Sequence, residues 1–373
     1  MKLLKKTRFS SMAVLALAMS VFVACDDNTG PAGETDPAEA AAAVQGVNAS
    51  FAANEGLQSF NVLAQSFTQV FGIAPVIVPS APGFEAMPAS IRAIAGQLGA
   101  IALRESGPAA AAGPVIDAQY YGTTFIYVDG GYVASQRTGA PADGVRFILY
   151  ALTPVTGEPI VDTELGYADL RDTSDASANR LQTTVVINGA TLIDYVSTCS
   201  LTQSSVAVSA IGFVSDGATV VDFDLTFSVS EFDGVTIDFS VDIPSENIEI
   251  DFSVTADQFG FNADVDPFGT GAFSFDFEIS QGTNAVHFTM AGTDGALSGG
   301  VDICGGADGL DCTTVANISG TLDAPIITDA GGNDLGEEGL AGIGNLFDAA
   351  GEFVGSFFGF LTPAFGLCGV AFL

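Results

Sequence analysis

Hydrophobic and polar residues alternate with a period of two along the middle of the chain. The clearest stretch is "VDFDLTFSVSEFDGVTIDFSVDIPSENIEIDFSV", residues 221–254, where Val, Phe, Leu or Ile alternate with Asp, Ser or Thr. This period is typical of strands with one buried and one solvated face. Strand centres are expected near Leu225, Phe239, Phe252, Ala263, Phe275 and Phe288, with further strands at 296–304 and 313–322. This close spacing predicts an antiparallel meander, because parallel pairing needs long crossovers.

Strand patterns begin near residue 118, and two hairpin turns are expected at Asp129-Gly130-Gly131 and at Asn188-Gly189. The whole pattern predicts about 12–15 strands. We therefore expect a mainly β protein: a large antiparallel meander, as a half-barrel, barrel or sandwich, with N-terminal helices and a C-terminal amphipathic helix.

Helical periodicity is confined to the two ends of the chain. Residues 41–72 predict one or two helices and residues 89–105 another, because apolar residues recur there at three- and four-residue steps. In the tail, one face of a helix would carry Leu340, Ile343, Phe347, Ala350, Val354, Phe357 and Leu361, and another would carry Gly351, Gly355 and Gly359. The glycine face suggests close approach to a flat surface, either the sheet or a membrane. A final strand is expected after this helix.

The N-terminus has the pattern of an export signal. Lys2, Lys5, Lys6 and Arg8 precede the apolar run "MAVLALAMSVFVA", which ends in "FVAC" at Cys25. These small residues before a cysteine resemble the lipobox of bacterial lipoproteins. The resemblance implies cleavage before Cys25 and lipidation of that cysteine, which would anchor the protein to a membrane; an ordinary secretory signal is the alternative.

Five segments follow from these patterns. They are a signal peptide at 1–24, an acidic flexible tether at 25–40, a helical segment at 41–115, an antiparallel β domain at 116–330, and a C-terminal helix with a final strand at 331–373.

The charge of the chain excludes one class of partner. After residue 24 the chain keeps six Arg against 44 Asp and Glu, a formal charge of 6 − 44 = −38, and no Lys or Arg follows Arg180. Binding to nucleic acid depends on neutralising phosphates with Lys and Arg, so we expect no nucleic-acid partner. The acidic surface indicates either a solvated wall or a collector of divalent cations.

Four cysteines besides Cys25 form an even set: Cys199, Cys304, Cys312 and Cys368. In an exported protein they are disulfide candidates, and four cysteines allow three pairings. We favour 304–312 with 199–368, because a turn-rich loop separates Cys304 from Cys312.

Phe residues recur at the apolar positions of the alternating strands, and this suggests a face that binds a ligand. Its candidates are Phe223, Phe227, Phe239, Phe252, Phe275 and Phe288. This face is either buried by the chain itself or open to a lipid or another hydrophobic ligand. The lipobox, the early helix and the long meander are similar in outline to half-barrel lipid-carrier lipoproteins, which implies a bound lipid.

Carboxylates occupy the opposite phase: Asp222, Asp224, Asp238, Asp242, Glu249, Asp251, Asp276 and Glu278. Their regular exposure supplies no cleft for acid–base catalysis, and the only histidine, His287, is expected on the polar face. Weak calcium candidates are Asp264 and Asp266 in "DVDPFG" and Asp329 and Asp334 in "DAGGNDLGEE". No other cofactor is expected.

The sequence therefore predicts a non-enzymatic, lipid-anchored protein of the cell envelope, at the outer membrane or cell surface. It would be structural or would bind a hydrophobic ligand on its Phe face. The alternative is a surface-exposed, adhesion-like interaction module, stabilised by calcium, whose protein partner the sequence does not name.

Overall fold

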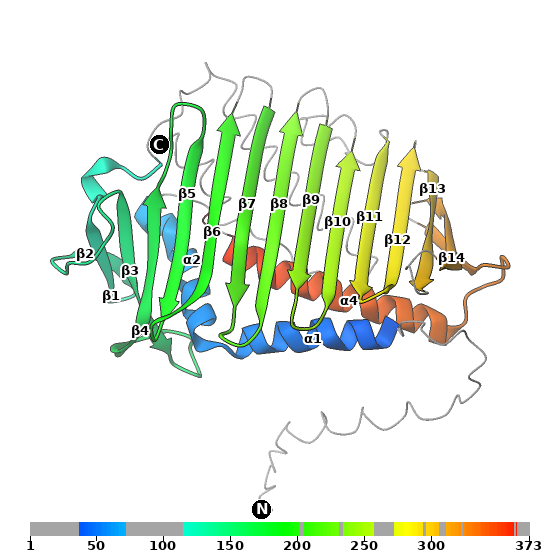
Figure 1. Cartoon of the computed structure of the whole chain (residues 1–373), viewed down its shortest axis with the longest axis horizontal. Helices are drawn as coiled ribbons and strands as arrows, with labels where there is room; N and C mark the ends of the chain where they lie inside the picture. The colour runs from blue at the N-terminus through cyan, green and yellow to red at the C-terminus, as the bar shows by residue number, and fades with distance from the viewer. Residues whose placement is uncertain are drawn as a thin grey trace, which may run out of the picture.

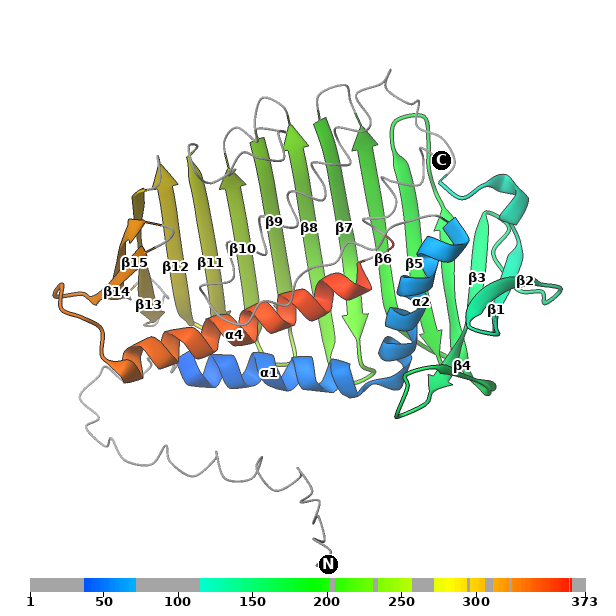
Figure 2. The same cartoon turned by 180° about the vertical axis from the view of Figure 1, so that it is seen from behind.

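One open sheet forms the body of the protein, and the three α-helices of the described residues lie on one of its faces (Figures 1 and 2). A computed structural model of the chain describes residues 37–71, 115–201, 205–230, 234–256, 272–293, 296–305, 311–321, 324–361 and 363. The mainly β meander with helices at both ends of the chain is confirmed. The described strands belong to one sheet and not to two stacked sheets.

The described residues contribute 15 strands to the sheet. They are β1 Thr123–Val128, β2 Gly131–Ser135, β3 Gly144–Leu152, β4 Pro159–Asp172, β5 Asn179–Ile187, β6 Ala190–Leu201, β7 Ser205–Ser215, β8 Val220–Ser230, β9 Gly234–Ile243, β10 Ile248–Ala256, β11 Phe273–Gln281, β12 Asn284–Thr293, β13 Ala296–Gly305, β14 Asp311–Thr321 and β15 Ala324–Asp329.

Strands that are neighbours in the chain are neighbours in the sheet from β3 to β15, and all of these pairs are antiparallel. The exception lies at the other end, where the order is β3-β1-β2 and β1 runs parallel to β3. The chain between β2 and β3 therefore passes back over β1. The sequence did not reveal this crossing, because the connection, residues 136–143, carries no pattern that distinguishes a crossing from a longer hairpin loop.

The two expected hairpin turns are present. Asp129 and Gly130 join β1 to β2 with φ of 48° and 92°, and Asn188 and Gly189 join β5 to β6 with φ of 50° and 83°. Positive φ at both central residues is the conformation whose twist matches that of the flanking strands, and Asn, Asp and Gly adopt it readily.

The N-terminal helices are α1, Pro37–Ala53, and α2, Glu55–Phe71. α1 begins inside the range that we assigned to the tether, and its first residue is proline, which suits the first turn of a helix. Asn54 separates the two helices: its Oδ1 accepts from the Leu57 N–H at 3.1 Å, and its Nδ2 donates to the Asp216 carbonyl at 2.8 Å. The break thus combines an N-cap for α2 with an anchor to the β7–β8 turn.

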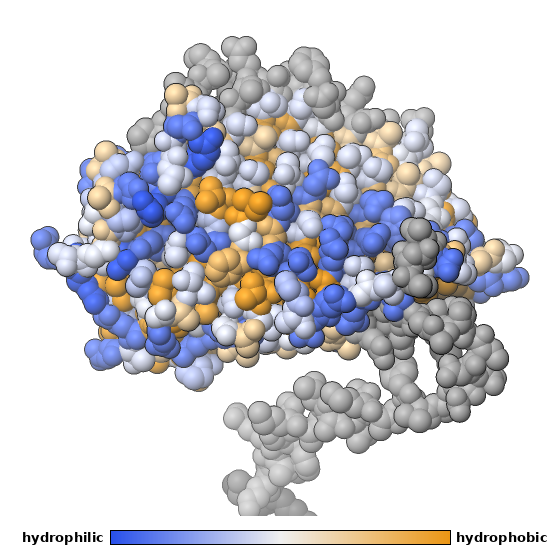
Figure 3. Space-filling view, viewed as in Figure 1, coloured by the Kyte–Doolittle hydropathy of each residue, from blue (hydrophilic) through white to orange (hydrophobic). Residues whose placement is uncertain are grey.

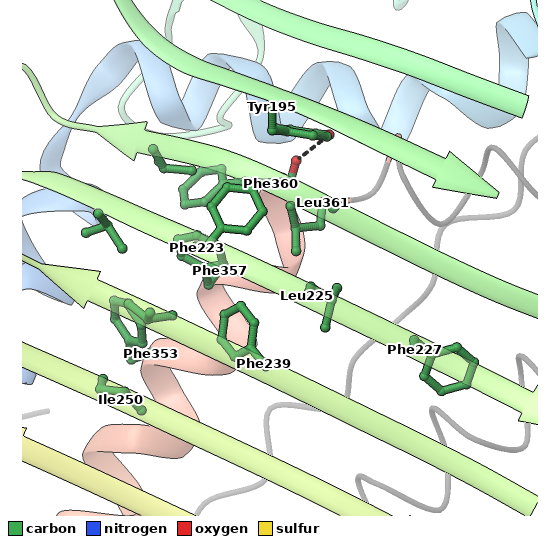
Figure 4. Packing of buried hydrophobic residues seen from close by; sticks show 14 of the residues in the cluster. Tyr195, Phe223, Leu225, Phe227, Phe239, Ile250, Phe353, Phe357, Phe360 and Leu361 are labelled. Carbon is green, nitrogen blue, oxygen red and sulfur yellow. Dashed lines mark hydrogen bonds between the residues drawn. The ribbon is translucent and has the colours of Figure 1, made fainter. Parts of the chain in front are cut away.

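The C-terminal helix α4, Glu337–Phe360, crosses the strands on the same face and lies alongside α1 (Figure 2). α2 packs on β2 to β4, where the Ser59 hydroxyl accepts from the Tyr150 N–H at 3.1 Å. Helices and sheet enclose one apolar core (Figure 4). None of the described helices combines the length and the apolar character needed to cross a membrane.

The predicted faces of α4 need correction. Phe353, Phe360 and Ala349, which we had not placed on the apolar face, are buried together with Phe357 and Leu361, whereas Val354 is half-buried. No described atom comes within 4 Å of a Cβ built at Gly351 or Gly355, so the expected close approach at these two residues is not made by the described part of the sheet. At Gly359 such a Cβ would lie 3.4 Å from Asn61 Oδ1 of α2, so the neighbour there is a helix.

Several expectations fall outside the described residues: the helix at 89–105, the strand near Ala263 and the final strand. Of the cysteines, Cys304 on β13 and Cys312 on β14 stand directly opposite each other and form a disulfide. Cys199 is buried and also disulfide-bonded, while its expected partner Cys368 is not described.

Candidate functional site

The sheet presents two chemically different faces. The inner face, toward the helices, carries the Phe residues, and the outer face, on the opposite side, carries the carboxylates. Figure 3 views the outer face, where many residues are hydrophilic. In β8 the burial alternates without interruption from Val220 to Ser230, with Phe223, Leu225 and Phe227 inside. The polar and apolar phases of the sequence thus correspond to the two faces.

The Phe candidates all lie on the inner face. Phe223, Phe227, Phe239, Phe275 and Phe288 are buried, and Phe252 is half-buried. Their rings form a ladder in β10 to β12, with centroids 5.3 Å apart for Phe252–Phe275 and 5.2 Å for Phe275–Phe288. The candidates are therefore brought together, as a layer of the core.

α4 fills part of this inner face. The Phe357 ring lies between Phe223 and Phe239, with centroids at 5.0 and 5.5 Å (Figure 4). The Tyr195 hydroxyl donates to the Phe360 carbonyl at 3.1 Å, which satisfies an acceptor at the end of the helix. At these positions the protein's own side chains occupy the space in which a ligand would lie.

On the outer face, the strand register brings like charges together. Asp242 of β9 stands opposite Asp222 on one neighbouring strand and opposite Glu249 on the other. One row further along, Asp251 stands opposite Glu278. Like charges directly across a strand pair destabilise a sheet, so these pairs lower the stability of this part of the sheet.

A hollow of about 320 Å³ lies within the carboxylate rows. It is lined by Asp224, Thr226, Asp238, Phe239, Ser240, Asp251, Phe252, Ser253 and Asp276. Across the strands, Ser240 stands between Asp224 and Asp251, and Ser253 stands between Asp238 and Asp276. The Ser253 hydroxyl donates to Asp238 at 2.9 Å. The hollow is therefore polar, negative and open to solvent.

The pKa of Glu249 reflects this crowding. Partial burial, followed by the charges of Asp251, Asp242 and Glu278, raises the pKa of Glu249 above its ordinary value. The folded protein thus binds a proton at Glu249 more tightly than the unfolded chain does. This part of the fold gains stability as the pH falls through the raised pKa and loses it as the pH rises.

We expect Glu249→Gln to increase the free energy of unfolding by about 0.5 kcal/mol at neutral pH, the scale of one solvent-screened cross-strand repulsion. The gain should shrink between about pH 7 and about pH 4, since the wild-type carboxyl then becomes neutral as well. Urea unfolding at both pH values measures it. Glu158→Gln in the exposed β3–β4 loop is the control, and an equal gain there would contradict the role of the carboxylate rows.

The arginines of the described residues lie at the other end of the sheet and are paired. Arg137 bonds Glu164 through two nitrogens, Arg171 bonds Asp143 in the same way, and Arg180 pairs with Asp175. Arg146 binds Asp169 with two bonds of 2.7 Å and lies 3.6 Å over the Tyr167 ring. These four are the arginines of the described residues, so β6 to β15 carry none.

His287 lies on the outer face, on the polar side of β12. Its Nε2 is 3.0 Å from Asp276 Oδ1, and it stands opposite Glu278 on β11 and Asp302 on β13. With carboxylates on both neighbouring strands, the imidazole is held within an acidic array on an open surface.

An apolar patch on the outer face was not predicted from the sequence. Val196 of β6 and Ile211 of β7 stand directly opposite each other, with 36% and 57% of their surfaces exposed. Beside them Phe213 is half-buried, and Figure 3 shows apolar residues gathered over β5 to β7. The alternation along β6 could have predicted this exposure, because Val196 falls on the same side of its strand as the polar residues Asp194 and Thr198.

The calcium candidates do not form a common site in the described residues. Asp264 and Asp266 lie outside them. Asp329 Oδ1 accepts from the Asn333 N–H at 2.8 Å, so this carboxylate closes its own turn, in which Asp334 forms an isolated bridge with Thr328. The described part of the chain contains no group of three or more His, Cys, Asp or Glu placed to hold a metal ion.

Comparison of the chain with protein-family models, with curated proteins and with solved structures found no match. Its class therefore follows from the fold alone: a mainly β protein built on one open 15-stranded meander sheet.

Proposed function

We propose that this protein is an exported, lipid-anchored, non-enzymatic protein of the bacterial cell envelope that acts as an interaction module. One observation carries the proposal: α4 occupies part of the inner face with its own Phe side chains, whereas the outer face is left free of described helices. A broad, regular face whose described hollow is open to solvent suits binding to another molecule better than catalysis.

The proposed location rests on two features of different kinds. The lipobox-like "FVAC" at Cys25 supports a lipid anchor, and stable anchoring follows when more than one acyl chain is attached. The Cys304–Cys312 disulfide supports an oxidising compartment outside the cytoplasm. We place the protein at the outer membrane or cell surface.

The anchor is tested by replacing Cys25 with alanine in the full-length chain. The wild type is expected to fractionate with membranes and to yield an N-terminal peptide that carries thioether-linked and amide-linked acyl groups by mass spectrometry. Cys25→Ala should leave the membrane fraction and lack these groups. A matched Cys312→Ala variant should keep its anchor. Unmodified Cys25 in the mature wild type would contradict the proposal.

A carrier of a hydrophobic ligand is the second candidate. The ring ladder of Phe252, Phe275 and Phe288 on the inner face favours it. Native mass spectrometry after detergent-free purification distinguishes the two functions. Lipid bound at a fixed ratio supports the carrier, and a protein of bare mass supports the interaction module.

A further inference from the structure

We propose that the outer face over β6 to β10 is a docking surface for a cationic protein segment that also presents an apolar side chain. The inference rests on the proposed role as an interaction module and goes further by naming the chemistry of the partner. Two independent observations meet here: an exposed apolar pair and, beside it, a hollow surrounded by carboxylates.

The two features lie in a single row across the strands. The register places Val196, Ile211, Asp224, Ser240 and Asp251 side by side on β6, β7, β8, β9 and β10. Neighbouring strands are about 4.8 Å apart, so the row leads from Ile211 to Asp251 over about 14 Å. A partner lying along this row would meet apolar surface first and negative charge next.

The apolar end of the row exposes side chains that water solvates poorly. A lone exposed Val or Ile is ordinary on a protein surface, but Val196 and Ile211 are cross-strand neighbours and adjoin the half-buried Phe213. Interfaces commonly combine such an apolar centre with a charged rim. This patch therefore supplies the centre, and the carboxylates supply the rim.

The acidic end selects the sign of the partner's charge. Asp224, Asp238, Asp251 and Asp276 surround the hollow, and no Lys or Arg follows Arg180 in the chain. The Ser253 hydroxyl donates to Asp238, and His287 Nε2 lies 3.0 Å from Asp276. A Lys or Arg side chain in the hollow would relieve the repulsion that these contacts leave among the four carboxylates. An acidic partner would meet added repulsion, which gives the face selectivity as well as attraction.

The spacing of the row defines the segment that fits. In an extended chain, residues two and four positions apart point the same way, at about 7 and about 13 Å. An apolar residue over Ile211 thus places a basic residue two positions later near Asp224 and another, four positions later, near Asp251. The expected pattern is apolar-x-basic-x-basic.

The probe is a fluorescent peptide, Leu-Thr-Arg-Thr-Arg, with two matched controls: Glu in place of both Arg, and Ser in place of Leu. Fluorescence anisotropy with the full-length protein is measured at low and at physiological salt. We expect the Arg peptide to bind at least about tenfold more tightly than the Glu peptide, and its affinity to fall with salt.

Variants of the outer face separate the contribution of the carboxylates to binding from that of the apolar pair. Asp224→Asn with Asp251→Asn should weaken binding of the Arg peptide by about tenfold. Ile211→Ser should weaken it by about threefold to tenfold and remove the preference for the Leu peptide. The charge-matched control, Asp129→Asn with Asp162→Asn, lies away from the row and should stay within about twofold. Circular dichroism checks that each variant is folded.

Three results would overturn the inference. One is an equal loss of affinity for the Arg peptide in the control and in the Asp224/Asp251 double variant. That result would show that binding depends on the net charge of the protein and not on these two residues. Another is a peptide affinity that Ile211→Ser does not change. The third is saturable calcium binding to the face with no measurable peptide binding. Each leaves acylation of Cys25 untouched, so failure here is distinguishable from failure of the proposed anchor.

Discussion

Phe357→Ala is expected to lower the free energy of unfolding by about 3–5 kcal/mol, the cost of deleting a fully buried Phe side chain. Phe357 is 1% exposed and contacts Phe223, Phe239 and Phe353 through its ring. Removing it leaves a cavity between α4 and the centre of the sheet. The surrounding strands cannot close this cavity, because hydrogen bonds on both sides fix their spacing.

Urea unfolding followed by far-ultraviolet circular dichroism measures this loss; the chain has no Trp for fluorescence. Ser356→Ala on the exposed side of α4 is the matched control and should change stability by less than about 0.5 kcal/mol. Phe357→Leu should cost less than Phe357→Ala, because it keeps much of the volume. A loss below about 1 kcal/mol for Phe357→Ala would show that α4 contributes little to the fold.

Gly166→Ala is expected to destabilise the protein by about 3 kcal/mol, the upper range for overpacking. Gly166 of β4 pairs with Leu149 of β3 and Ile187 of β5, so it has a strand on each side. A Cβ there would lie 1.9 Å from the Val186 carbonyl oxygen. Because the obstacle is backbone, no side chain can rotate away, and the β4–β5 pair must separate.

Gly46→Ala provides the matched control with the opposite sign. Gly46 is an exposed residue of α1, and no described atom lies within 4 Å of a Cβ built there. Alanine in a helix interior is favoured over glycine by about 1 kcal/mol, so this variant should be more stable than the wild type. The urea midpoints of the two variants should therefore move in opposite directions. If both move together, the close contact at Gly166 is not the cause.

The alternation of residue types was sufficient to predict the meander, because each strand buries one face and solvates the other. Phe223, Phe239 and Phe275 all lie on the predicted side. The turns at Asn188-Gly189 and Asp129-Gly130 were equally readable, since their residue types adopt positive φ. The strands and turns depend on residues that are close together in the sequence, so the residue types alone were enough to predict them.

What the sequence did not reveal depends on contacts between distant segments. The parallel β1–β3 pair results from a crossing that leaves no mark in periodicity. The buried side of α4 depends on how the helix is rotated over the sheet, so Phe353 and Phe360 were missed. The Val196–Ile211 pair was overlooked because its adjacency is set by the β6–β7 register and not by either strand alone.

The order of the strands also has a consequence for how the protein folds. From β3 to β15 each strand pairs with its predecessor, so the sheet can extend one hairpin at a time with only short loops to close. Contact between α1 and α4 joins opposite ends of the chain, and it becomes accessible once the sheet has formed a surface on which both helices lie. At about 1.5 Å per residue, the 17-residue α1 and the 24-residue α4 reach across several strands. We therefore expect the helices to pack late in folding, after neighbouring strands have paired, and to join the strands into one cooperative unit.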